Sequence, residues 1–296
     1  ACLPGQSGGK PGSSQGGRGQ RDQRDQREQR DQRGPRRAGP GTRHLRPQLP
    51  VARGNDLLYG RNAVLEALRG ERTLHRVWMA EGVRDDERIA AILELAGERT
   101  VPVEQVPREM LDDATRGANH QGVGLEAGEY QYAELGEVIG REGTVLVLDH
   151  LQDPQNFGTL LRAAEAAGVA GVIIPEDRAV AVTPAVVNAS AGAVEHLPVA
   201  ATPNLPRALE DLKRSGRWVL GLAGEAGAAD LFTSDVPTPA ALVVGAEGTG
   251  LGKRVRATCD LLVGLPMRGR VESLNAATAG SIALYDLLRR ERAAGS

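Results

Sequence analysis

The sequence has 296 residues, which is long enough for two modest domains and a tail. It has no apolar run long enough to cross a membrane and no N-terminal apolar segment typical of a secretory signal, so we expect neither a membrane protein nor a secreted one. Cys2 and Cys259 are too few for a disulfide framework, which favours a reducing cytoplasm. Without a cluster of cysteines and histidines, we expect no metal site.

The net charge of −2 conceals an asymmetry along the chain. The first 50 residues hold 11 Lys and Arg against 4 Asp and Glu, a net charge of +7, which leaves −9 for residues 51–296. Residues 1–52 are of low complexity, and Arg21–Arg33 repeats a three-residue unit without an apolar member. We expect a disordered Arg/Gly/Gln-rich tail that attracts RNA phosphates and adds nothing to a core; the alternative is a solvated linker without a specific role.

Ordered structure is predicted to begin near Asp56. Helices are predicted at 57–70, 86–99 and 107–115, and strands at 75–80, 101–106 and 120–127. This alternation predicts a small, compact α/β domain over residues 53–128. The polar stretch 129–142 lacks periodicity and is interpreted as a linker.

From residue 143 the chain alternates continuous apolar runs with helical patterns. Strands are predicted at 144–151, 171–175, 197–200, 217–223, 241–247 and 260–266. Helices are predicted at 156–168, 183–197 and 204–216, and from Ser273 onward. Apolar strands of this kind indicate a mainly parallel sheet that is covered on both faces.

Two common nucleotide-binding patterns are absent from this second half. The first strand runs into DHLQDPQNFG rather than into a G-x-G-x-x-G turn, which argues against a dinucleotide-binding fold. The Gly-rich segment after Leu242 contains Lys253, but Arg254 follows it where a Walker A motif has Ser or Thr. A cofactor site, if present, must be assembled in another way.

The last helix is rich in small residues, which let a helix lie close to other backbone. It is predicted to open with Ser273, Leu274 and Asn275. One face is predicted to pack inward because the following residues recur at helical spacing: Leu274, Ala277, Ser281, Leu284 and Leu288.

Three segments together resemble the motifs of the SpoU-type (TrmH-like) RNA 2'-O-ribose methyltransferases of the SPOUT superfamily. They are Asp149–Gly168 (DHLQDPQNFGTLLRAAEAAG), Leu242–Gly252 (LVVGAEGTGLG) and Leu265–Asn275 (LPMRGRVESLN). Each segment alone is typical of an ordinary turn or helix, but the three occur in the order found in the family. The resemblance implies a SPOUT domain with a deep trefoil knot over residues 143–296, a bound S-adenosylmethionine and a homodimer.

The N-terminal part extends the resemblance. LLYGRNAVLEAL and ANHQGVGLEA look like the beginning and end of the L30e-like substrate-binding domain of bacterial enzymes that methylate a guanosine ribose of 23S rRNA. The resemblance implies RNA-binding positions at Arg61, Arg116, Asn119 and His120. The alternative for His120 is a loop histidine whose hydrogen bonds are satisfied within the protein.

The resemblance also implies which residues form the active site. The cofactor is expected among the loops 245–250, 265–268 and 271–274, with these cofactor-binding positions: Gly245, Gly250, Leu265, Met267 and Leu274. The catalytic positions implied around the reacting 2'-hydroxyl are Arg162, Asn156, Glu247, Ser273 and Asn275.

The first motif indicates an anion-binding arginine on physical grounds as well. If Asn156 caps the helix, Gly158 and Arg162 stand at i and i+4, and the long Arg162 side chain leans over Gly158 toward the helix N-terminus. A cation near the positive end of a helix dipole is unfavourable unless it is held there for an anion, such as an RNA phosphate or a developing alkoxide. The alternative is an ordinary surface arginine.

We therefore predict S-adenosylmethionine-dependent methylation of a guanosine 2'-hydroxyl by a cytoplasmic homodimer. Its partner would be 23S rRNA or a ribosome assembly intermediate. Because a guanidinium stays protonated near neutral pH, we expect Arg162 to stabilise the alkoxide rather than act as a plain base. In the family the active site lies at a dimer interface, so Arg162 is expected to serve the partner's cofactor. The alternatives are a 2'-O-methyltransferase for tRNA or another rRNA nucleotide, or a catalytically silent RNA-binding protein on the same fold.

Overall fold

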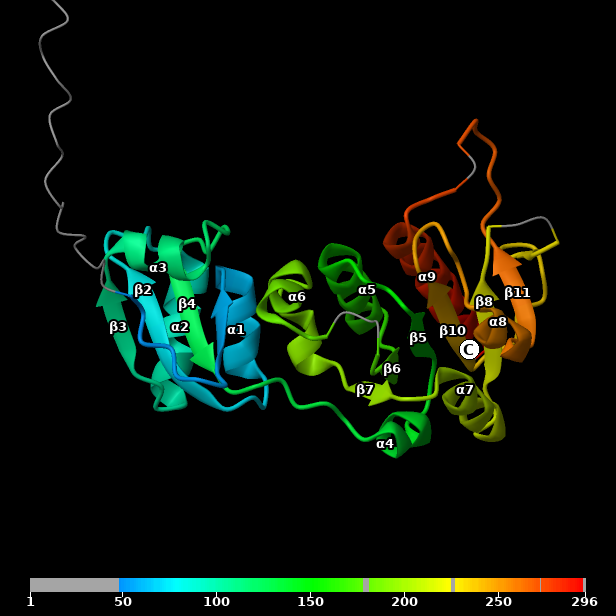
Figure 1. Ribbon diagram of the computed structural model, residues 1–296, viewed down its shortest axis with the longest axis horizontal. Helices are drawn as coiled ribbons and strands as arrows, with labels where there is room; N and C mark the ends of the chain where they lie inside the picture. Colours follow the sequence, from blue (N-terminus) through cyan, green and yellow to red (C-terminus); the bar gives the residue numbers. More distant parts are fainter. Residues whose placement is uncertain (1–47, 178–180, 225–226, 272, 295–296) are drawn as a thin grey trace, which may run out of the picture. The chain divides into compact units, whose positions relative to one another are not determined.

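The computed structural model describes residues 48–177, 181–224, 227–271 and 273–294, which form two β-sheets with their helices (Figure 1). The predicted tail therefore lies outside the described residues up to residue 47. Its last residues contradict the expectation that it adds nothing to a core. Leu49 is buried in a cluster with Trp78, and the backbone N–H of Ala52 donates to Glu126 Oε1 at 2.8 Å.

The N-terminal sheet has four strands in the order β1-β4-β2-β3. They are β1 (Asp56–Tyr59), β2 (Leu74–Ala80), β3 (Val103–Val106) and β4 (Val123–Ala127). The pair β2 and β3 is parallel, whereas β4 is antiparallel to both β1 and β2. The predicted helix at 57–70 is wrong in its first residues, because Gly60 takes a positive φ of 91° that separates strand β1 from the helix that follows.

Helices cover both faces of this sheet. They are α1 (Arg61–Arg69), α2 (Glu87–Glu98) and α3 (Arg108–Ala114). Successive side chains of β2 point to opposite faces: Val77 packs with α1 and α2, whereas Trp78 packs with Leu111 of α3. This arrangement confirms the small α/β domain expected from the alternating pattern.

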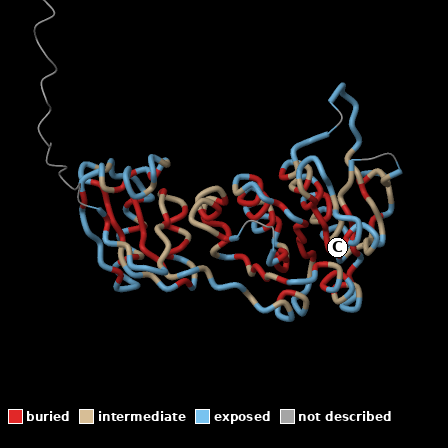
Figure 2. Tube along the Cα trace, in the orientation of Figure 1, coloured by how far each residue is buried: buried red, intermediate tan, exposed pale blue. Residues whose placement is uncertain are grey.

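The second sheet has seven strands in the order β7-β6-β5-β10-β8-β11-β9, and all its strand pairs are parallel. They are β5 (Val145–Asp149), β6 (Gly171–Pro175), β7 (Val199–Thr202), β8 (Trp218–Leu222), β9 (Ala229–Asp230), β10 (Ala240–Gly245) and β11 (Leu261–Gly264). Strands β5, β6 and β10 are buried along their whole length (Figure 2). The mainly parallel sheet is thus confirmed; the trefoil knot stays a prediction.

Helices pack on both faces of the second sheet. They are α4 (Leu135–Gly140), α5 (Pro154–Ala166), α6 (Pro184–Ala189), α7 (Leu205–Arg214), α8 (Lys253–Thr258) and α9 (Ala276–Ala294). Successive side chains of β5 point to opposite faces of the sheet. Leu146 packs in the core that contains residues of α5, α6 and α9, whereas Val147 packs in the core that contains residues of α4, α7 and α8. None of the helices within the described ranges has the length and apolar character that crossing a bilayer requires.

Four local features differ from the sequence-based expectations. Helix α4 lies inside the predicted linker and buries Val138, and strand β9 and helix α8 were not predicted. The predicted helix at 183–197 is broken into α6 and the 3-10 helix η1 (Ala193–His196), because Ala191 and Gly192 both take positive φ angles.

The last helix begins later than predicted. Asn275 lies just before α9, and Leu274 is 42% exposed instead of packing inward. The close approach expected from small residues is present further along. A Cβ atom on Gly280 would lie 2.6 Å from Leu160 Cδ2, so a larger residue here would require the Leu160 side chain or α9 to shift.

Candidate active site

Four neighbouring strands end at one edge of the seven-stranded sheet. Strands β5, β10, β8 and β11 are adjacent and parallel, so the loops that follow them meet at the same edge. Open parallel sheets bind ligands at the carboxyl ends of their strands. The three motif segments follow β5, β10 and β11, so the fold brings all three to this edge.

A cavity of about 670 Å³ lies among these loops, which is a volume typical of small-molecule sites. Every residue predicted to bind the cofactor lines it: Gly245, Gly250, Leu265, Met267 and Leu274. Three of the predicted catalytic residues also line it: Glu247, Ser273 and Asn275. Glycines and leucines from the three loops thus surround one space, which fits a nucleoside held between apolar walls and backbone groups.

The cavity also has a wall that the sequence analysis missed. Leu222, Ala223 and Gly224 line it from the end of β8, and Arg256 lines it from α8. Strand β8 carries none of the motifs, which is why its end was not considered. Its position beside β10 depends on the strand order of the sheet, which local patterns do not reveal.

Asn275 connects the three motif segments through its side-chain amide. Its Oδ1 accepts hydrogen bonds from the backbone N–H groups of Ala277 at 2.9 Å and Thr278 at 3.1 Å, and so caps α9. Its Nδ2 donates to Asn156 Oδ1 at 2.9 Å and to Glu247 Oε1 at 2.5 Å. One amide therefore fixes the start of α9 to the first and second motifs.

Asn156 does not cap α5 as predicted. Asp153 is the N-cap, because its carboxylate accepts hydrogen bonds from the backbone N–H groups of Gln155 at 3.1 Å and Asn156 at 3.3 Å. Pro154 occupies the first helical position, where the missing N–H costs nothing. The Asn156 side chain is instead buried and turned toward Asn275.

Gly158 serves a different contact from the one expected. A Cβ atom at this position would lie 2.4 Å from Ala189 Cβ, so the glycine permits α5 to pack against α6 rather than clearing a path for an arginine. Arg162 is exposed, and no residue within the described ranges forms a hydrogen bond or ion pair with its guanidinium. The described residues that line the 670 Å³ cavity do not include Arg162.

The predicted RNA-binding loop of the N-terminal domain divides into two kinds of residue. Arg116 and Asn119 are exposed. His120 is held inside the protein, with its side chain 3% exposed. Its Nε2 lies 2.8 Å from Asp112 Oδ1, and its Nδ1 accepts from the backbone N–H of Gly122 at 3.0 Å. This geometry corresponds to the satisfied loop histidine.

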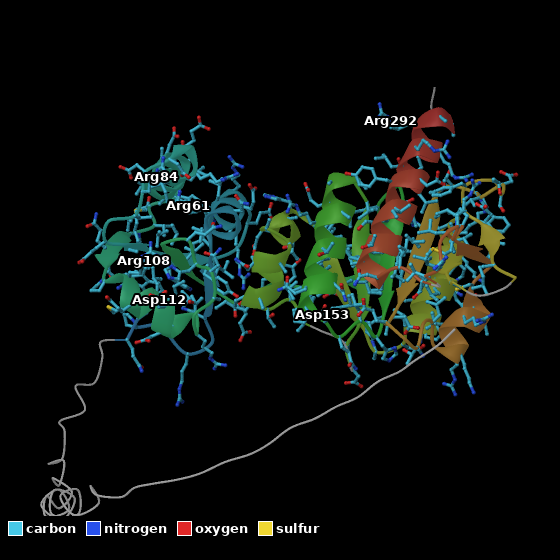
Figure 3. The ribbon with its side chains drawn as sticks, turned by 90° about the horizontal axis from the view of Figure 1, so that it is seen from above. Arg61, Arg84, Arg108, Asp112, Asp153 and Arg292 are labelled. Atoms are coloured by element: carbon cyan, nitrogen blue, oxygen red, sulfur yellow. The ribbon has the colours of Figure 1, made fainter. Side chains whose placement is uncertain are left out.

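Arg61 is likewise engaged within the protein. Its guanidinium pairs with Asp86 and donates to the carbonyl oxygen of Arg84 at 3.1 Å. Figure 3 labels Arg61 and Arg84, which both belong to the four-stranded domain. Its backbone N–H donates to Gln121 Oε1 at 2.9 Å, which attaches α1 to the loop. Arg108, which the sequence analysis missed, is exposed and has a guanidinium nitrogen 3.5 Å from the point where a Cβ of Gly122 would lie.

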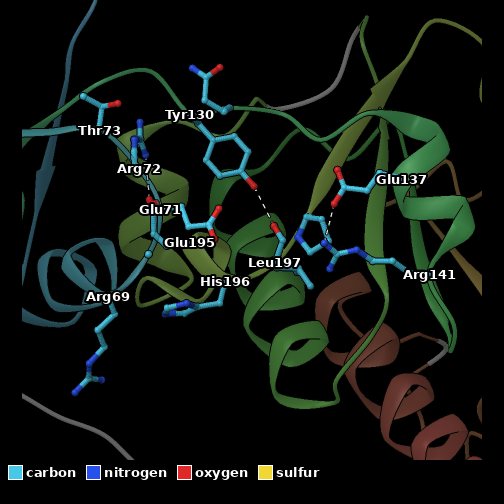
Figure 4. A pocket seen from close by; sticks show the side chains of 13 residues that line it. Arg69, Glu71, Arg72, Thr73, Tyr130, Glu137, Arg141, Glu195, His196 and Leu197 are labelled. Atoms are coloured by element: carbon cyan, nitrogen blue, oxygen red, sulfur yellow. Dashed lines mark hydrogen bonds and ion pairs between the residues drawn. The ribbon is translucent and has the colours of Figure 1, made fainter.

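A second cavity, of about 570 Å³, is lined by Arg72, Tyr130, Glu195 and Arg141 among others (Figure 4). Its buried charges pair with each other: Arg72 Nη1 lies 3.0 Å from Glu195 Oε1. Burial raises the pKa of Glu195, and Arg72 opposes that shift. Tyr130 donates its hydroxyl to Leu197 O at 3.0 Å. Because these polar groups already have partners, the cavity is a weaker candidate for a ligand than the first.

Comparisons with known proteins agree with this geometry. Residues 143–285 match the model of the SpoU rRNA Methylase family, and residues 57–133 match that of RNA 2'-O ribose methyltransferase substrate binding. A putative TrmH family tRNA/rRNA methyltransferase from Bacillus subtilis, YacO, is 39% identical over 251 residues, which cover 83% of this chain and 100% of that protein.

Two solved structures resemble the chain over most of its length. An AdoMet-bound rRNA methyltransferase from Sinorhizobium meliloti is 26% identical with a TM-score of 0.66, covering 80% of this chain and 88% of that one. The SpoU methyltransferase AviRb from Streptomyces viridochromogenes, in complex with AdoMet, is 24% identical with a TM-score of 0.67, covering 81% and 91%. The likeness to AviRb is one of fold.

Proposed function

Because this chain belongs to the SpoU (TrmH) family of RNA methyltransferases, we propose that it methylates the ribose 2'-hydroxyl of a guanosine in 23S rRNA. Its cofactor is S-adenosylmethionine. The observation that carries the proposal is the convergence of three distant segments on one cavity, joined by the Asn275 amide. A separate N-terminal domain that matches a substrate-binding family favours a large structured RNA.

The residues present fit S-adenosylmethionine. Leu222, Leu265 and Leu274 offer apolar surface for the adenine, and the backbone near Gly245 approaches the cavity without a side chain in the way. When bound, the cofactor supplies an electrophilic methyl group on its sulfonium. The network of Asn275, Asn156 and Glu247 holds the three motif segments in place around it.

Arg162 is proposed to stabilise the negative charge that develops on the 2'-oxygen. An exposed guanidinium without a partner among the described residues is available for a phosphate or an alkoxide. A guanidinium gives up its proton only with difficulty, which favours electrostatic stabilisation over general-base catalysis. Ser273 lines the cavity and can donate or accept a hydrogen bond near the reacting groups.

We propose that the protein acts as a homodimer in which Arg162 of one chain serves the cofactor of the other. Two observations support this arrangement. Arg162 is outside the described lining of the cavity in its own chain. On α9, Ile282 and Tyr285 are 37% and 50% exposed and stand three residues apart, which leaves apolar surface for a second copy.

We propose that exposed residues of the N-terminal domain contact the RNA and that its buried residues hold the contacting loop in place. Arg116 and Asn119 are available to RNA, and Arg108 extends the same surface. His120 and Arg61 are proposed to shape the loop that presents them. Of the predicted division we retain the substrate-binding domain at 53–128 and the methyltransferase domain at 143–296; helix α4, within the predicted linker at 129–142, packs in the core of the second sheet. The protein is proposed to act in the cytoplasm.

The proposal is tested by mapping ribose methylation on 23S rRNA and tRNA from a strain that lacks the protein. We expect one 2'-O-methylguanosine of 23S rRNA to disappear and to return with the wild-type chain but not with Arg162→Ala. Loss of a tRNA methylation instead would identify a tRNA enzyme. An unchanged methylation pattern would favour a silent RNA-binding protein and overturn the proposal.

A further inference from the structure

One buried carboxylate at the edge of the active site has no part in the functions assigned so far. Asp149 is the last residue of β5, and its side chain is 1% exposed. It pairs in register with Gly245 at the end of β10, where the cavity begins. Asp149 itself is not among the described residues that line the cavity.

Both oxygens of this carboxylate are engaged. Oδ2 accepts a hydrogen bond from the backbone N–H of Gly252 at 2.6 Å, and Oδ1 lies 2.5 Å from His150 Nδ1. A buried carboxylate is costly unless hydrogen bonds replace its water, and bonds to an ionised acceptor are among the stronger ones in proteins. The short hydrogen bond to Asp149 therefore fixes the position of the Gly252 backbone.

Gly252 is the end of the loop that forms one wall of the cavity. The loop leaves β10 at Gly245 and closes on itself, because the backbone N–H of Gly250 donates to Ala246 O at 2.9 Å. Its return passes so near that a Cβ on Gly245 would lie 2.3 Å from the carbonyl carbon of Gly250. The base of the loop is thus fixed by backbone contacts.

The far end of the loop depends on Asp149. A Cβ on Gly252 would lie 3.2 Å from Asp149 Oδ2, closer than an ordinary contact, so the absence of a side chain lets the backbone reach the carboxylate. Between its two attachment points the loop presents Glu247, whose carboxylate accepts from Asn275. A shift at Gly252 would therefore reach both the cavity wall and the motif network.

We propose that Asp149 is a positioning residue for cofactor binding: its carboxylate anchors the loop 245–252 over the cavity. It acts through the backbone of Gly252 and does not touch the cofactor. His150 completes the anchor, and it holds a left-handed backbone conformation with a φ of 58° while doing so. The inference rests on the proposed function only for the location of the S-adenosylmethionine site and is independent of the RNA target.

The test replaces the carboxylate by its amide isostere, Asp149→Asn. An asparagine has one acceptor oxygen where the carboxylate has two. If that oxygen faces Gly252, its NH2 group faces His150 Nδ1, whose ring must then take the tautomer that accepts there; if it faces His150, the N–H of Gly252 meets an NH2 group. In either orientation the contact with Gly252 is weaker than that made by a carboxylate. We expect the affinity for S-adenosylmethionine, measured by calorimetry, to fall about 10- to 100-fold. In the cofactor-free protein, the amides of residues 246–252 should exchange hydrogen faster than in the wild type.

Asp260→Asn is the matched control. The Asp260 carboxylate also accepts from a backbone N–H, that of Val219 at 2.9 Å, but at the start of β8 and β11 rather than at their ends. Both variants should lower the melting temperature, whereas only Asp149→Asn should weaken cofactor binding. A purely structural Asp149 would behave like Asp260, with unchanged affinity and unchanged exchange in the loop, and that result would overturn the inference.

Gly252→Ala decides the question if Asp149→Asn does not fold. The added methyl group presses on Asp149 Oδ2 without removing its charge, and the φ of −59° at this position is open to alanine. We expect weaker cofactor binding in the same direction as for Asp149→Asn, and unchanged binding would again overturn the inference. Failure of the wild-type chain to bind S-adenosylmethionine would instead overturn the cofactor site itself.

Discussion

The two predicted binding regions differ in how their residues are placed. One is the cavity at the edge of the seven-stranded sheet, and the other is the RNA-binding loop of the four-stranded domain with the start of α1. At the sheet edge, three distant segments meet, and the predicted cofactor residues all face one cavity. In the second region, Arg61 at the start of α1 and His120 of the loop are engaged inside the protein, whereas Arg116 and Asn119 of the loop are exposed. The first region is a cavity whose lining residues form hydrogen bonds with one another. The second is an exposed polar surface, and buried hydrogen bonds hold its loop in place.

This difference reflects what each region has to bind. A small cofactor is recognised by a preformed hollow whose walls are fixed before binding, so its residues bond to each other. RNA is held through phosphates and bases that approach from outside, so the contacting residues remain exposed and other residues fix the loop. Substitutions should therefore affect methyl transfer strongly and specifically in the first region and affect RNA affinity gradually in the second.

The largest expected effect comes from Arg162→Ala. Removing a group that stabilises the developing oxyanion should lower the rate of methyl transfer about 100- to 1,000-fold or more, with cofactor binding largely retained. Arg162→Lys should rescue poorly, because a compact ammonium lacks the planar fork of donors. Single-turnover assays and calorimetry measure the two quantities.

Mixing subunits tests which chain's cofactor Arg162 serves. The second variant is Gly245→Val, whose side chain would collide with Gly250 in the cofactor loop. A mixed dimer of one Arg162→Ala chain and one Gly245→Val chain has one intact site if Arg162 acts across the interface. Activity should then return, up to about half of the wild-type value per mixed dimer. No recovery, with exchange confirmed by mass spectrometry, would assign the arginine to its own chain's site.

A smaller effect is expected from Asn275→Asp. The aspartate oxygen keeps the cap of α9, so the melting temperature should change little. Its carboxylate can no longer donate to Asn156 and stands against Glu247, so methyl transfer and cofactor affinity should both fall about tenfold. Asn275→Ala, which also removes the cap, should lose about 0.5–2 kcal/mol of stability in addition. Equal stability of the two variants would contradict the capping role.

In the RNA-binding loop, Arg116→Ala and His120→Ala should differ in kind. Arg116→Ala should weaken RNA binding several-fold and reduce its salt dependence by about one phosphate contact. His120→Ala should cost about 1–3 kcal/mol of stability by leaving Gly122 N–H and Asp112 without their partner, yet keep the salt slope. Filter binding across a salt titration separates them, and an altered slope for His120→Ala would indicate direct phosphate contact.

Removal of residues 1–46 should have the smallest effect at physiological salt. This cut keeps Leu49 and the Ala52 contact with Glu126, which removal of 1–52 would destroy. Folding and cofactor affinity should be unchanged, and RNA affinity should fall mainly at low salt because ions screen attraction between the tail and phosphates. Identical RNA affinities with and without the tail at every salt concentration would reduce it to a passive linker.

The sequence alone determined the elements whose signals are local. Apolar runs predicted the strands of the parallel sheet, because such patterns depend on neighbours within a few positions and survive without a three-dimensional context. The residues that line the cofactor cavity were predicted from the resemblance of three segments to the SpoU-type enzymes. Glycines such as Gly280 could be predicted to permit close packing, because a stripe of small residues is visible in the chain.

Only the tertiary structure decided which neighbour each residue serves. Leu222 joins the cavity because β8 lies beside β10, and Gly158 is required because Ala189 presses against it. His120 can be buried because Asp112 and the backbone N–H of Gly122 give both of its ring nitrogens a hydrogen-bond partner. Asp149 reaches Gly252 across 103 positions of sequence. These contacts arise from strand order and helix packing. Hydrogen bonds between distant segments produce no periodic pattern in the sequence, so the sequence alone could not predict them.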